Sequence, residues 1–445
     1  MATTTSQINE IKEDLSDAYT ALGAKGATLP ESNARGTANL ASTINSLPKE
    51  GFPNKLWDVD ANGVTTVPTG TFSEDSFDDI VEISSSKTLA NAFKNVEVNR
   101  DITFRNLTTI GNIGLQYSFG GTKRPSGSSK FNISFPNVTS IGHRGCNQLA
   151  YNSSAFGSFS CAVETLTCSS EFKEAFRESS IESLSFPNLT SINTTGDAGS
   201  FYLMCVKCTS LKSVSFPNLT TITTPSITSS EASLFGSAFS RCTSLTSISF
   251  PELTTITGDS SGSYDSKTFT GVCQECTALL TASFPKLTTI SGSSYAFRLA
   301  FSKCSALTSV DFSSLKTVGS NCFEEMCSRC VSLTSAKFDS LEEIGVSVFS
   351  QAFYGCKALT SISFPSLTTV GSSSFQYCFS GCTGLTTISF PSLTTVKSNS
   401  FTNCFNNCTA LTEIHFPAAI QSTIEATTGY SSKWGATNAT IYFDL

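Results

Sequence analysis

One twelve-residue segment recurs along this 445-residue chain and constrains its fold more than any other feature. It reads LTSISFPELTTI at 245–256, LTSISFPSLTTV at 359–370 and LTTISFPSLTTV at 385–396. We number each unit from the Phe that precedes Pro in these segments, which is position zero. Eleven units have a Phe at this position, from Phe104 to Phe416, although Pro does not follow in all of them. We expect a twelfth, degenerate position zero at Cys168. A chain built from one repeated unit is expected to stack its units into an array instead of folding around a single core.

Each unit has two halves with different periodicity. The half L-x-x-I-x-F alternates apolar and polar residues, which predicts a strand, and the following Pro ends the strand because it has no N–H to donate. The L-x-x-I after the Pro predicts a second, short extended segment. The other half, F-x-x-x-F/C-x-x-C, has spacings of four and three, as in Phe375, Phe379 and Cys382, and predicts a short helix or 3₁₀ turn. The 35 Phe, against 2 Trp and 10 Tyr, indicate one aromatic slot filled in unit after unit.

The combined pattern C-x-x-L-x-x-I-x-F-P-x-L-x-x-I…F-x-x-x-F-x-x-C closely resembles the BspA-like (Treponema-type) leucine-rich repeat. The resemblance covers residues 89–417, although this sequence has Phe where that family often has Leu and several of its units are longer. It implies a mainly-β fold with short helices, in which about twelve units form a leucine-rich-repeat solenoid with a parallel sheet. It also implies surface adhesion or recognition instead of catalysis.

The 17 cysteines follow the repeat and do not form the framework of a small disulfide-rich domain. Eight occupy position −8: Cys208, Cys242, Cys276, Cys304, Cys330, Cys356, Cys382 and Cys408. Three more, Cys205, Cys273 and Cys327, occupy position −11, which other units fill with Phe. A slot shared by Cys and Phe is a core slot, so we expect buried, reduced thiols. The three C-x-x-C pairs could suggest zinc or redox chemistry, but none has a second pair or a His nearby, and we expect neither metal nor cofactor.

Composition excludes several classes of function. The net charge of −7 offers no basic surface for nucleic acid, and no apolar run approaches the roughly 18 residues of a membrane-inserted helix. The two histidines, His143 and His415, are far apart in sequence, which argues against a His-based triad or a multi-His metal site. The outward strand positions offer only Asp311 and Glu413 as carboxylates, about four units apart. We therefore expect no catalytic residues and no enzyme activity.

Two surfaces are candidates for recognition. The outward positions −3 and −1 form a strip rich in hydroxyl groups, which includes Ser249 and Ser363 and could be a binding platform or simply a soluble surface. The longer units contain Gly/Ser/Thr-rich loops at 120–130, 223–233 and 257–268, which we expect to project from one edge of the array as binding loops or tolerated insertions. The candidate loop residues are Lys123, Arg124, Ser226, Tyr264, Asp265 and Lys267.

The two ends differ from the repeats. Residues 1–50 contain Ile8, Ile11, Leu15, Ala18 and Leu22, whose alternating spacing of three and four forms a seam typical of helix association. This segment is expected to be helical and either to dock or oligomerise, for example as a homotrimer, or to cap the solenoid. Residues 17–48 also resemble N-terminal segments of phage and prophage tail or fibre proteins. Residues 51–88 are expected to form a β-rich lead-in cap, and residues 418–445 a C-terminal cap.

These patterns lead to two functional interpretations. In the first, the protein is a non-enzymatic structural or attachment protein of a phage virion, of the tail or head fibre type. It would bind other virion proteins through residues 1–50 and present the solenoid to a host-surface protein or glycan. The N-terminus has no recognisable secretory signal, which suits a virion protein assembled in the host cytoplasm. The alternative is a cellular BspA-like adhesin or host-interaction protein at the bacterial cell surface.

Overall fold

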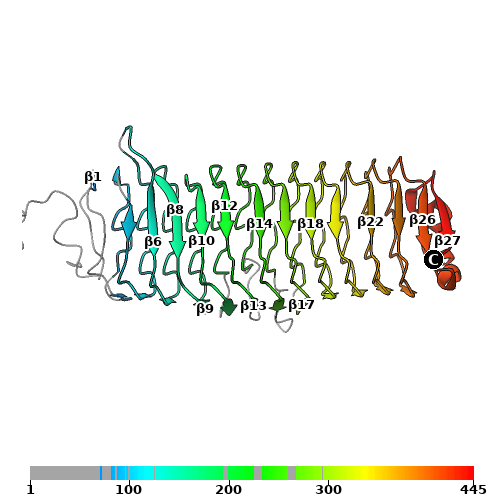
Figure 1. The fold of residues 1–445 in the computed structure, drawn as a ribbon, viewed down its shortest axis with the longest axis horizontal. Coiled ribbons are helices and arrows are strands. Elements are labelled where there is room, and N and C mark those ends of the chain that lie inside the picture. The colour runs from blue at the N-terminus through cyan, green and yellow to red at the C-terminus, as the bar shows by residue number, and fades with distance from the viewer. Residues whose placement is uncertain are drawn as a thin grey trace, which may run out of the picture.

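The computed structural model describes residues 71–72, 82–85, 88–95, 97–98, 101–124, 126–193, 199–224, 233–258, 267–292 and 294–445. In these residues the chain winds through about twelve stacked coils, which form an elongated solenoid (Figure 1). Each coil has three sides, which we call sheet 1 (the strand before the Phe–Pro corner), sheet 2 (the strand after it) and the turn face (the F-x-x-x-F/C-x-x-C half).

Sheet 1 consists of parallel strands in which equivalent repeat positions lie side by side. For example, Ile388 pairs with Ile414. Its hydrogen bonds form three blocks, β4 to β12, β14 to β20 and β22 to β27. The parallel sheet that the repeat predicts is thus confirmed. The strands are β4 (Ile102–Thr103), β6 (Phe131–Phe135), β8 (Phe156–Cys161), β10 (Ser183–Ser185), β12 (Ser213–Ser215), β14 (Ser247–Ser249), β16 (Thr281–Ser283), β18 (Ser309–Asp311), β20 (Ser335–Lys337), β22 (Ser361–Ser363), β24 (Thr387–Ser389), β26 (Glu413–Phe416) and β27 (Thr440–Phe443).

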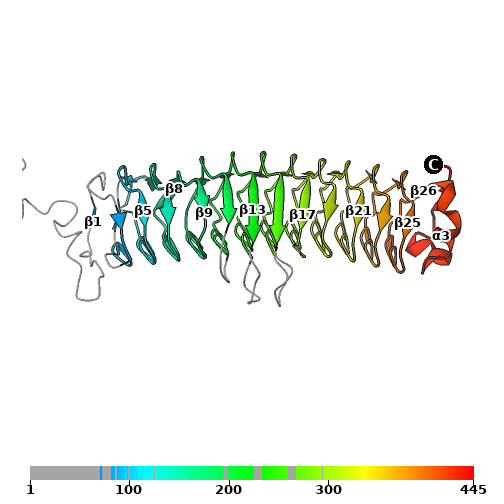
Figure 2. The same cartoon turned by 90° about the horizontal axis from the view of Figure 1, so that it is seen from below.

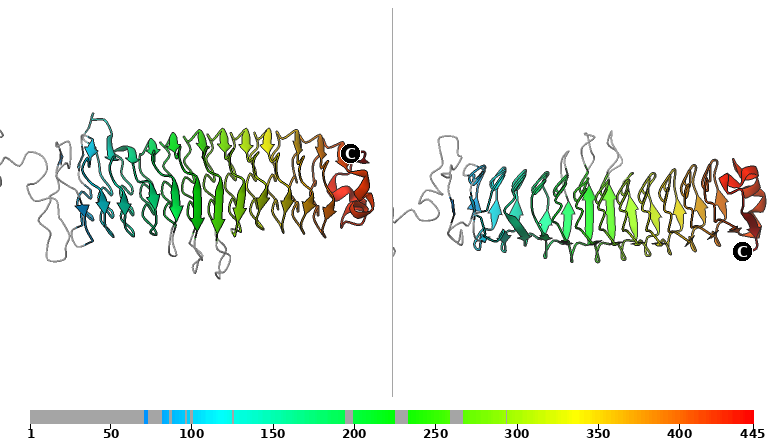
Figure 3. Two further views of the ribbon diagram at one scale, coloured as in Figure 1. Left: turned by 60° about the horizontal axis from the view of Figure 1, so that its bottom comes forward. Right: turned by 90° about the horizontal axis from the view of Figure 1, so that it is seen from above.

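Sheet 2 is also parallel and runs beside sheet 1 along the whole array (Figures 2 and 3). The Pro that follows most position-zero residues separates the two sheets at the corner of the coil, because it cannot donate to a ladder. The strands are β2 (Glu82–Ile83), β5 (Thr109–Ile110), β7 (Ser140–Ile141), β9 (Thr165–Leu166), β11 (Ser191–Asn193), β13 (Thr221–Thr224), β15 (Thr255–Gly258), β17 (Thr289–Ser291), β19 (Thr317–Val318), β21 (Glu343–Ile344), β23 (Thr369–Val370) and β25 (Thr395–Val396). A separate pair, β1 (Thr71–Phe72) and β3 (Glu97–Val98), lies at the N-terminal end.

Of the two possibilities that the sequence leaves open for the turn face, a short helix or a 3₁₀ turn, the described coils adopt turns. The turn face consists of consecutive turns in which every fourth residue has a positive φ, such as Glu325 at 52° and Arg329 at 63°. The N–H of Cys330 donates to the carbonyl of Cys327 in the same coil at 3.0 Å, as in a 3₁₀ turn. The N–H of Arg329, however, donates to the carbonyl of Tyr354 in the next coil at 2.6 Å. A helix would turn all its N–H groups along its own axis and could not make these bonds between coils.

The third coil corrects the register that the sequence predicts. Cys161, and not Cys168, occupies position zero, because β8 pairs with β6 and places Cys161 opposite Phe135. In this coil Phe156 and Phe159 occupy the places of the usual Leu and Ile. Cys168 lies beyond β9 and is half-buried.

Phenylalanines fill three ladders in the core, not the single slot that composition indicates; the third, at position −11, contains Phe353, Phe379 and Phe405. Position-zero rings stack on one another, as Phe312 and Phe338 do at 5.6 Å between centroids. Turn-face rings such as Phe323 and Phe349 stack at 5.2 Å, and Phe349 meets Phe338 edge-on at 5.0 Å. Each buried Phe contributes about 2–3 kcal/mol through burial. Favourable ring geometry adds about 0.5–1.5 kcal/mol per pair, which helps to fix the register between coils.

The C-terminal segment covers the last coil. It contains η2 (Ala418–Ile420), α3 (Gln421–Glu425) and η3 (Tyr430–Gly435), which places Trp434 against Phe401 with 5.2 Å between ring centroids. β27 then joins sheet 1 beside β26. These are the helices of the described chain, and none of them is long and apolar enough to cross a membrane. The helical segment expected at residues 1–50 lies outside the described residues, as do most of residues 51–88.

Candidate recognition surfaces

All 17 cysteines are free, and all except Cys168 are buried, which confirms the buried, reduced thiols that the repeat predicts. Burial raises the pKa of the Cys356 thiol well above its ordinary value, and the nearby thiols Cys330 and Cys382 raise it further. A thiol held in its neutral form is a poor nucleophile and a poor metal ligand. Within the ranges that the structure describes, no group of three or more His, Cys, Asp or Glu side chains could hold a metal ion. The cysteines are therefore part of the core, and recognition must use the outer surfaces.

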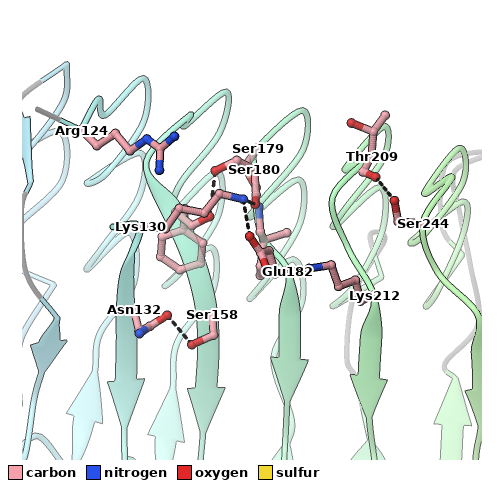
Figure 4. Close-up of polar contacts among 12 residues, drawn as sticks. Arg124, Lys130, Asn132, Ser158, Ser179, Ser180, Glu182, Thr209, Lys212 and Ser244 are labelled. Atoms are coloured by element: carbon pink, nitrogen blue, oxygen red, sulfur yellow. Dashed lines mark hydrogen bonds and ion pairs between the residues drawn. The ribbon is translucent and has the colours of Figure 1, made fainter. Parts of the chain in front are cut away.

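A hollow opens on sheet 1 near its N-terminal end, where the insertion at 120–130 returns to β6. We call it the basic hollow, and its volume is ≈ 350 Å³. It spans the strands β6, β8 and β10 (Figure 4). It is lined by Arg124, Lys130, Asn132, Gly157, Ser158, Glu182 and Ser183.

Glu182 lies between two lysines at the edge of the basic hollow. Lys130 Nζ donates to Glu182 Oε1 at 2.7 Å and to the carbonyl of Ser180 at 2.7 Å. Lys212 Nζ donates to Glu182 Oε2 at 3.0 Å. The hydrogen bonds from Lys130 and then Lys212 lower the pKa of Glu182 to about 2. The carboxylate therefore stays ionised at physiological pH and holds both ammonium groups at the rim (Figure 4).

Arg124 is exposed on the 120–130 insertion and lies on the Lys130 side of the cluster, away from Lys212 (Figure 4). Its Nη1 donates to the carbonyl of Ser128 at 3.2 Å, and its other guanidinium N–H groups make no hydrogen bond with any described residue. The cluster thus holds three cations, Arg124, Lys130 and Lys212, of which the two lysines are paired with the one carboxylate of Glu182. Asp101 adds a second carboxylate next to the floor of the hollow, where it accepts hydrogen bonds from Asn132 at 2.9 Å. The cluster is net positive in a chain whose net charge is −7.

Gly157 keeps the floor of the basic hollow open. A Cβ at this position would lie 2.8 Å from Asn132 Oδ1 and 3.2 Å from Lys130 Cβ. Next to it, Ser158 Oγ donates to Asn132 Oδ1 at 2.6 Å, which fixes the amide at the floor. The hollow thus combines a cationic rim with a polar, preformed floor, which suits an anionic group such as a carboxylate or a sulfate.

The repeat region was compared with known proteins. It matches the family described as "BspA type Leucine rich repeat region (6 copies)" over residues 172–298, 209–352, 266–404 and 347–427. Together these matches span more than half of the chain. The protein belongs to the BspA-type leucine-rich repeat family. Comparison with curated protein sequences gave no match.

Solved structures similar to this BspA-type protein are also repeat proteins. A leucine-rich repeat protein from Bacteroides ovatus shares 20% sequence identity, with 86% of this chain and 96% of that chain covered and a TM-score of 0.44. An internalin from Listeria monocytogenes shares 12%, with 70% and 81% covered and a TM-score of 0.22. The Toll–Spätzle complex of Drosophila shares 14%, with 84% and 52% covered and a TM-score of 0.22.

The insertions of this BspA-type protein lie at two corners of the coil, not along one edge as the sequence predicts. The segment 120–130 joins the turn face to sheet 1, whereas 223–233 and 257–268 join sheet 2 to the turn face. Of the loop candidates, Lys123 and Arg124 are exposed, and Lys267 is half-buried with its carbonyl accepting a hydrogen bond from Ser233. Ser226, Tyr264 and Asp265 lie outside the described residues, as do the N-terminal docking candidates Ile8, Ile11, Leu15, Ala18 and Leu22.

The strip of hydroxyl groups on sheet 1 does not gather its candidates into one site. Ser249 and Ser363 are both exposed, but they lie in different hydrogen-bonded blocks of the sheet, four coils apart. Ser363 Oγ lies 3.4 Å from Ser389 Oγ in the next coil, so neighbouring hydroxyls satisfy one another.

The sequence analysis missed Lys130, Glu182 and Lys212. Glu182 and Lys212 both occupy position −4, which many other units fill with Thr. Charged residues at this position in two successive units are the signal that could have indicated the site. Lys130 could not have been found in this way, because only the path of the 120–130 insertion brings it to Glu182.

Proposed function

We propose that this protein is a non-enzymatic recognition protein of a bacterial cell surface, and that it attaches to a macromolecule carrying carboxylate or sulfate groups. The observation that carries the proposal is Arg124, whose unused guanidinium donors line the same hollow as Lys130. Lys130 and, farther along the rim, Lys212 are both ion-paired with Glu182. The planar guanidinium of arginine can donate two parallel hydrogen bonds to two oxygens of one carboxylate or sulfate group. The ionised Glu182 holds the lysines at the rim, so an incoming anion meets donors that are already ordered.

The cell-surface interpretation is preferred over the virion interpretation. The latter depends on the resemblance of residues 17–48 to tail and fibre proteins, and the family match begins only at residue 172. The BspA-type family match supports a role in adhesion or recognition through the repeat array itself. Docking or oligomerisation through residues 1–50 remains a separate prediction.

The proposal predicts that the anionic partner is held by the local cluster of cations and that binding depends on salt. A protein with a net charge of −7 repels polyanions at long range, so an anionic partner must be held by a local cluster. Exposed charges are screened within about 8 Å at physiological salt, and binding through the basic hollow should therefore weaken as salt is added.

The test uses the full-length protein and three immobilised polysaccharides: heparin, which carries sulfates, polygalacturonic acid, which carries carboxylates, and neutral dextran. We expect binding to at least one of the acidic polymers and none to dextran. The substitutions Arg124→Ala and Lys130→Ala should each weaken it about tenfold, the loss typical of an important charged contact. Lys286→Ala is the control, because this lysine, like Lys130, is ion-paired with a glutamate, in its case Glu252 at 2.7 Å. Failure to bind either acidic polymer, or equal losses in the control, would refute the proposal.

A further inference from the structure

A second, longer hollow lies on the turn face, in the regular C-terminal half of the array. We call it the turn-face groove, and its volume is ≈ 540 Å³. It is lined by residues of successive coils, from Gln274 to Tyr377, so its long axis follows the solenoid. The basic hollow lies on sheet 1 and shares no residue with it.

The groove exists because small residues occupy one turn position in two successive coils. Ser302 and Ser328, both at position −10, are only 3% and 7% exposed and form the floor. The same position in the following coil holds Tyr354, which also lines the groove. Leu299 and Arg329 belong to the two opposite walls, at positions −13 and −9.

The walls offer aromatic and planar polar side chains. Tyr354 is 36% exposed, which is high for a large side chain in this array. Tyr377 accepts a hydrogen bond from Asn403 Nδ2 at its hydroxyl oxygen, at 2.8 Å, and the bond fixes the ring while leaving the O–H free to donate. The guanidinium of Arg329 and the amide of Gln351 make no hydrogen bond with any described residue.

Charge in the groove is nearly balanced. Lys303 Nζ is paired with Glu275 at 3.0 Å, and Glu325 lies 3.8 Å from Arg298. Only Arg329 adds an unpaired charge to the walls. A strongly charged ligand would therefore gain little here, in contrast to the basic hollow.

The groove is also unsuited to an extended peptide. Peptides that add a strand need free backbone groups, but the N–H groups of Lys303 and Arg329 donate to the next coil at 2.8 and 2.6 Å. Peptides that use side-chain anchors need apolar pockets, and Leu299 is the only large aliphatic side chain in the lining. What remains are a tyrosine ring, planar amide and guanidinium groups, and hydroxyls.

We infer that the turn-face groove binds a linear, uncharged oligosaccharide whose chain lies along the solenoid axis. Sugar rings present a C–H face that packs on tyrosine and hydroxyl groups that pair with arginine and glutamine. A groove that continues across coils of equal thickness suits a polymer of equal units.

The test measures binding of short oligosaccharides from cellulose, chitin, mannan and xylan to the full-length protein by calorimetry, with a proline-rich and a Gly/Ser-rich peptide for comparison. We expect at least one oligosaccharide series to bind and neither peptide to bind. Tyr377→Ala and Arg329→Ala should each weaken binding about tenfold, whereas Tyr377→Phe should retain most of it because the ring is kept. Tyr117→Ala is the matched control, because Tyr117 also lies two residues before a buried Phe of the turn face, but in an N-terminal coil.

Several outcomes would overturn the inference: no oligosaccharide binding by the wild-type protein, binding unaffected by Tyr377→Ala and Arg329→Ala, or peptide binding through the same residues. Circular dichroism of each variant verifies that the fold is retained. Arg124→Ala should leave oligosaccharide binding unchanged, so this inference and the proposed function can fail independently.

Discussion

The thiol of Cys356 donates a hydrogen bond to the backbone carbonyl of Cys327 in the preceding coil, with 3.2 Å between sulfur and oxygen. That carbonyl already accepts from the N–H of Cys330, so the thiol adds a link between coils. The other cysteines at position −8 form equivalent bonds, with sulfur–oxygen distances from 2.8 to 3.0 Å. A thiol is apolar enough for the core and still a weak donor, which explains why this slot holds Cys in coil after coil.

Cys356→Ala should lower the free energy of unfolding by about 1–2 kcal/mol, because it removes a buried sulfur and leaves a small cavity. Chemical denaturation followed by tyrosine fluorescence measures the change. Cys168→Ala is the control, since Cys168 is half-buried and should cost less. An equal loss at both positions would show that the ladder of thiols has no special role.

Thiol-reactive reagents should modify the native protein only at Cys168. The other cysteines are buried, and burial raises the pKa of thiols such as Cys161 to about 12, so almost no thiolate is present at neutral pH. Mass spectrometry of protein labelled before and after denaturation counts the reactive thiols, and all 17 should react once unfolded. Disulfides in the unreduced protein would contradict this prediction.

The pairing of β27 with β26 should weaken as pH rises through the raised pKa of His415. His415 stacks on Tyr442 at 5.0 Å and lies 2.9 Å from Asp444. Partial burial lowers the pKa of His415, but hydrogen bonds with Asp444 and Glu413 outweigh it, and the net shift is upward from 6.5. The pKa of His415 is higher in the folded state than in the unfolded state. The stabilisation that protonated His415 gives to the folded state is therefore complete below pH 6.5 and disappears as the pH rises through the raised pKa. His415→Gln should remove this pH dependence from the hydrogen exchange of the β27 amides, after correction for intrinsic rates.

Glu171 should make the protein less stable as pH rises from acidic to neutral. Its side chain is buried, and its Oε1 accepts from the N–H of Cys168 at 2.8 Å. The hydroxyl of Ser200 and backbone N–H groups lower its pKa, but burial outweighs them. Burial is the largest cause of its raised pKa, so the folded protein favours the protonated acid. The stabilisation of the folded state by the protonated acid is complete when the pH is below 4.5, the ordinary pKa of a glutamate. It is lost as the pH rises through the higher pKa of the folded state.

Glu171→Gln should therefore raise the denaturation midpoint at neutral pH and flatten its dependence on pH. Glu174→Gln is the control, because this nearby glutamate is half-buried and ion-paired with Arg177 at 3.4 Å. A variant with an unchanged midpoint at neutral pH would show that Glu171 finds a partner when ionised.

The repeat pattern alone determined the solenoid, the parallel pairing of its strands and the burial of the cysteines. In a stack of similar units, one position meets almost the same surroundings in every coil. A position at which Cys and apolar residues replace one another is therefore a buried position. Position −11 is an example, because it holds Cys327 in one coil and Phe353 in the next, and both are buried. Position zero was assigned correctly wherever Phe precedes Pro and failed in the third coil, where Cys161 replaces Phe.

Only the tertiary structure decided the turn face and the two hollows. Spacings of four and three fit a helix as well as turns, and turns form here because alternate N–H groups, such as that of Arg329, find partners in the next coil. Lys130 contacts Glu182 because an insertion returns to the sheet two coils away. Tyr377 and Arg329 line one groove because separate coils stack. Such neighbours depend on insertion paths and on bonds between coils, which the residues of a single unit do not specify.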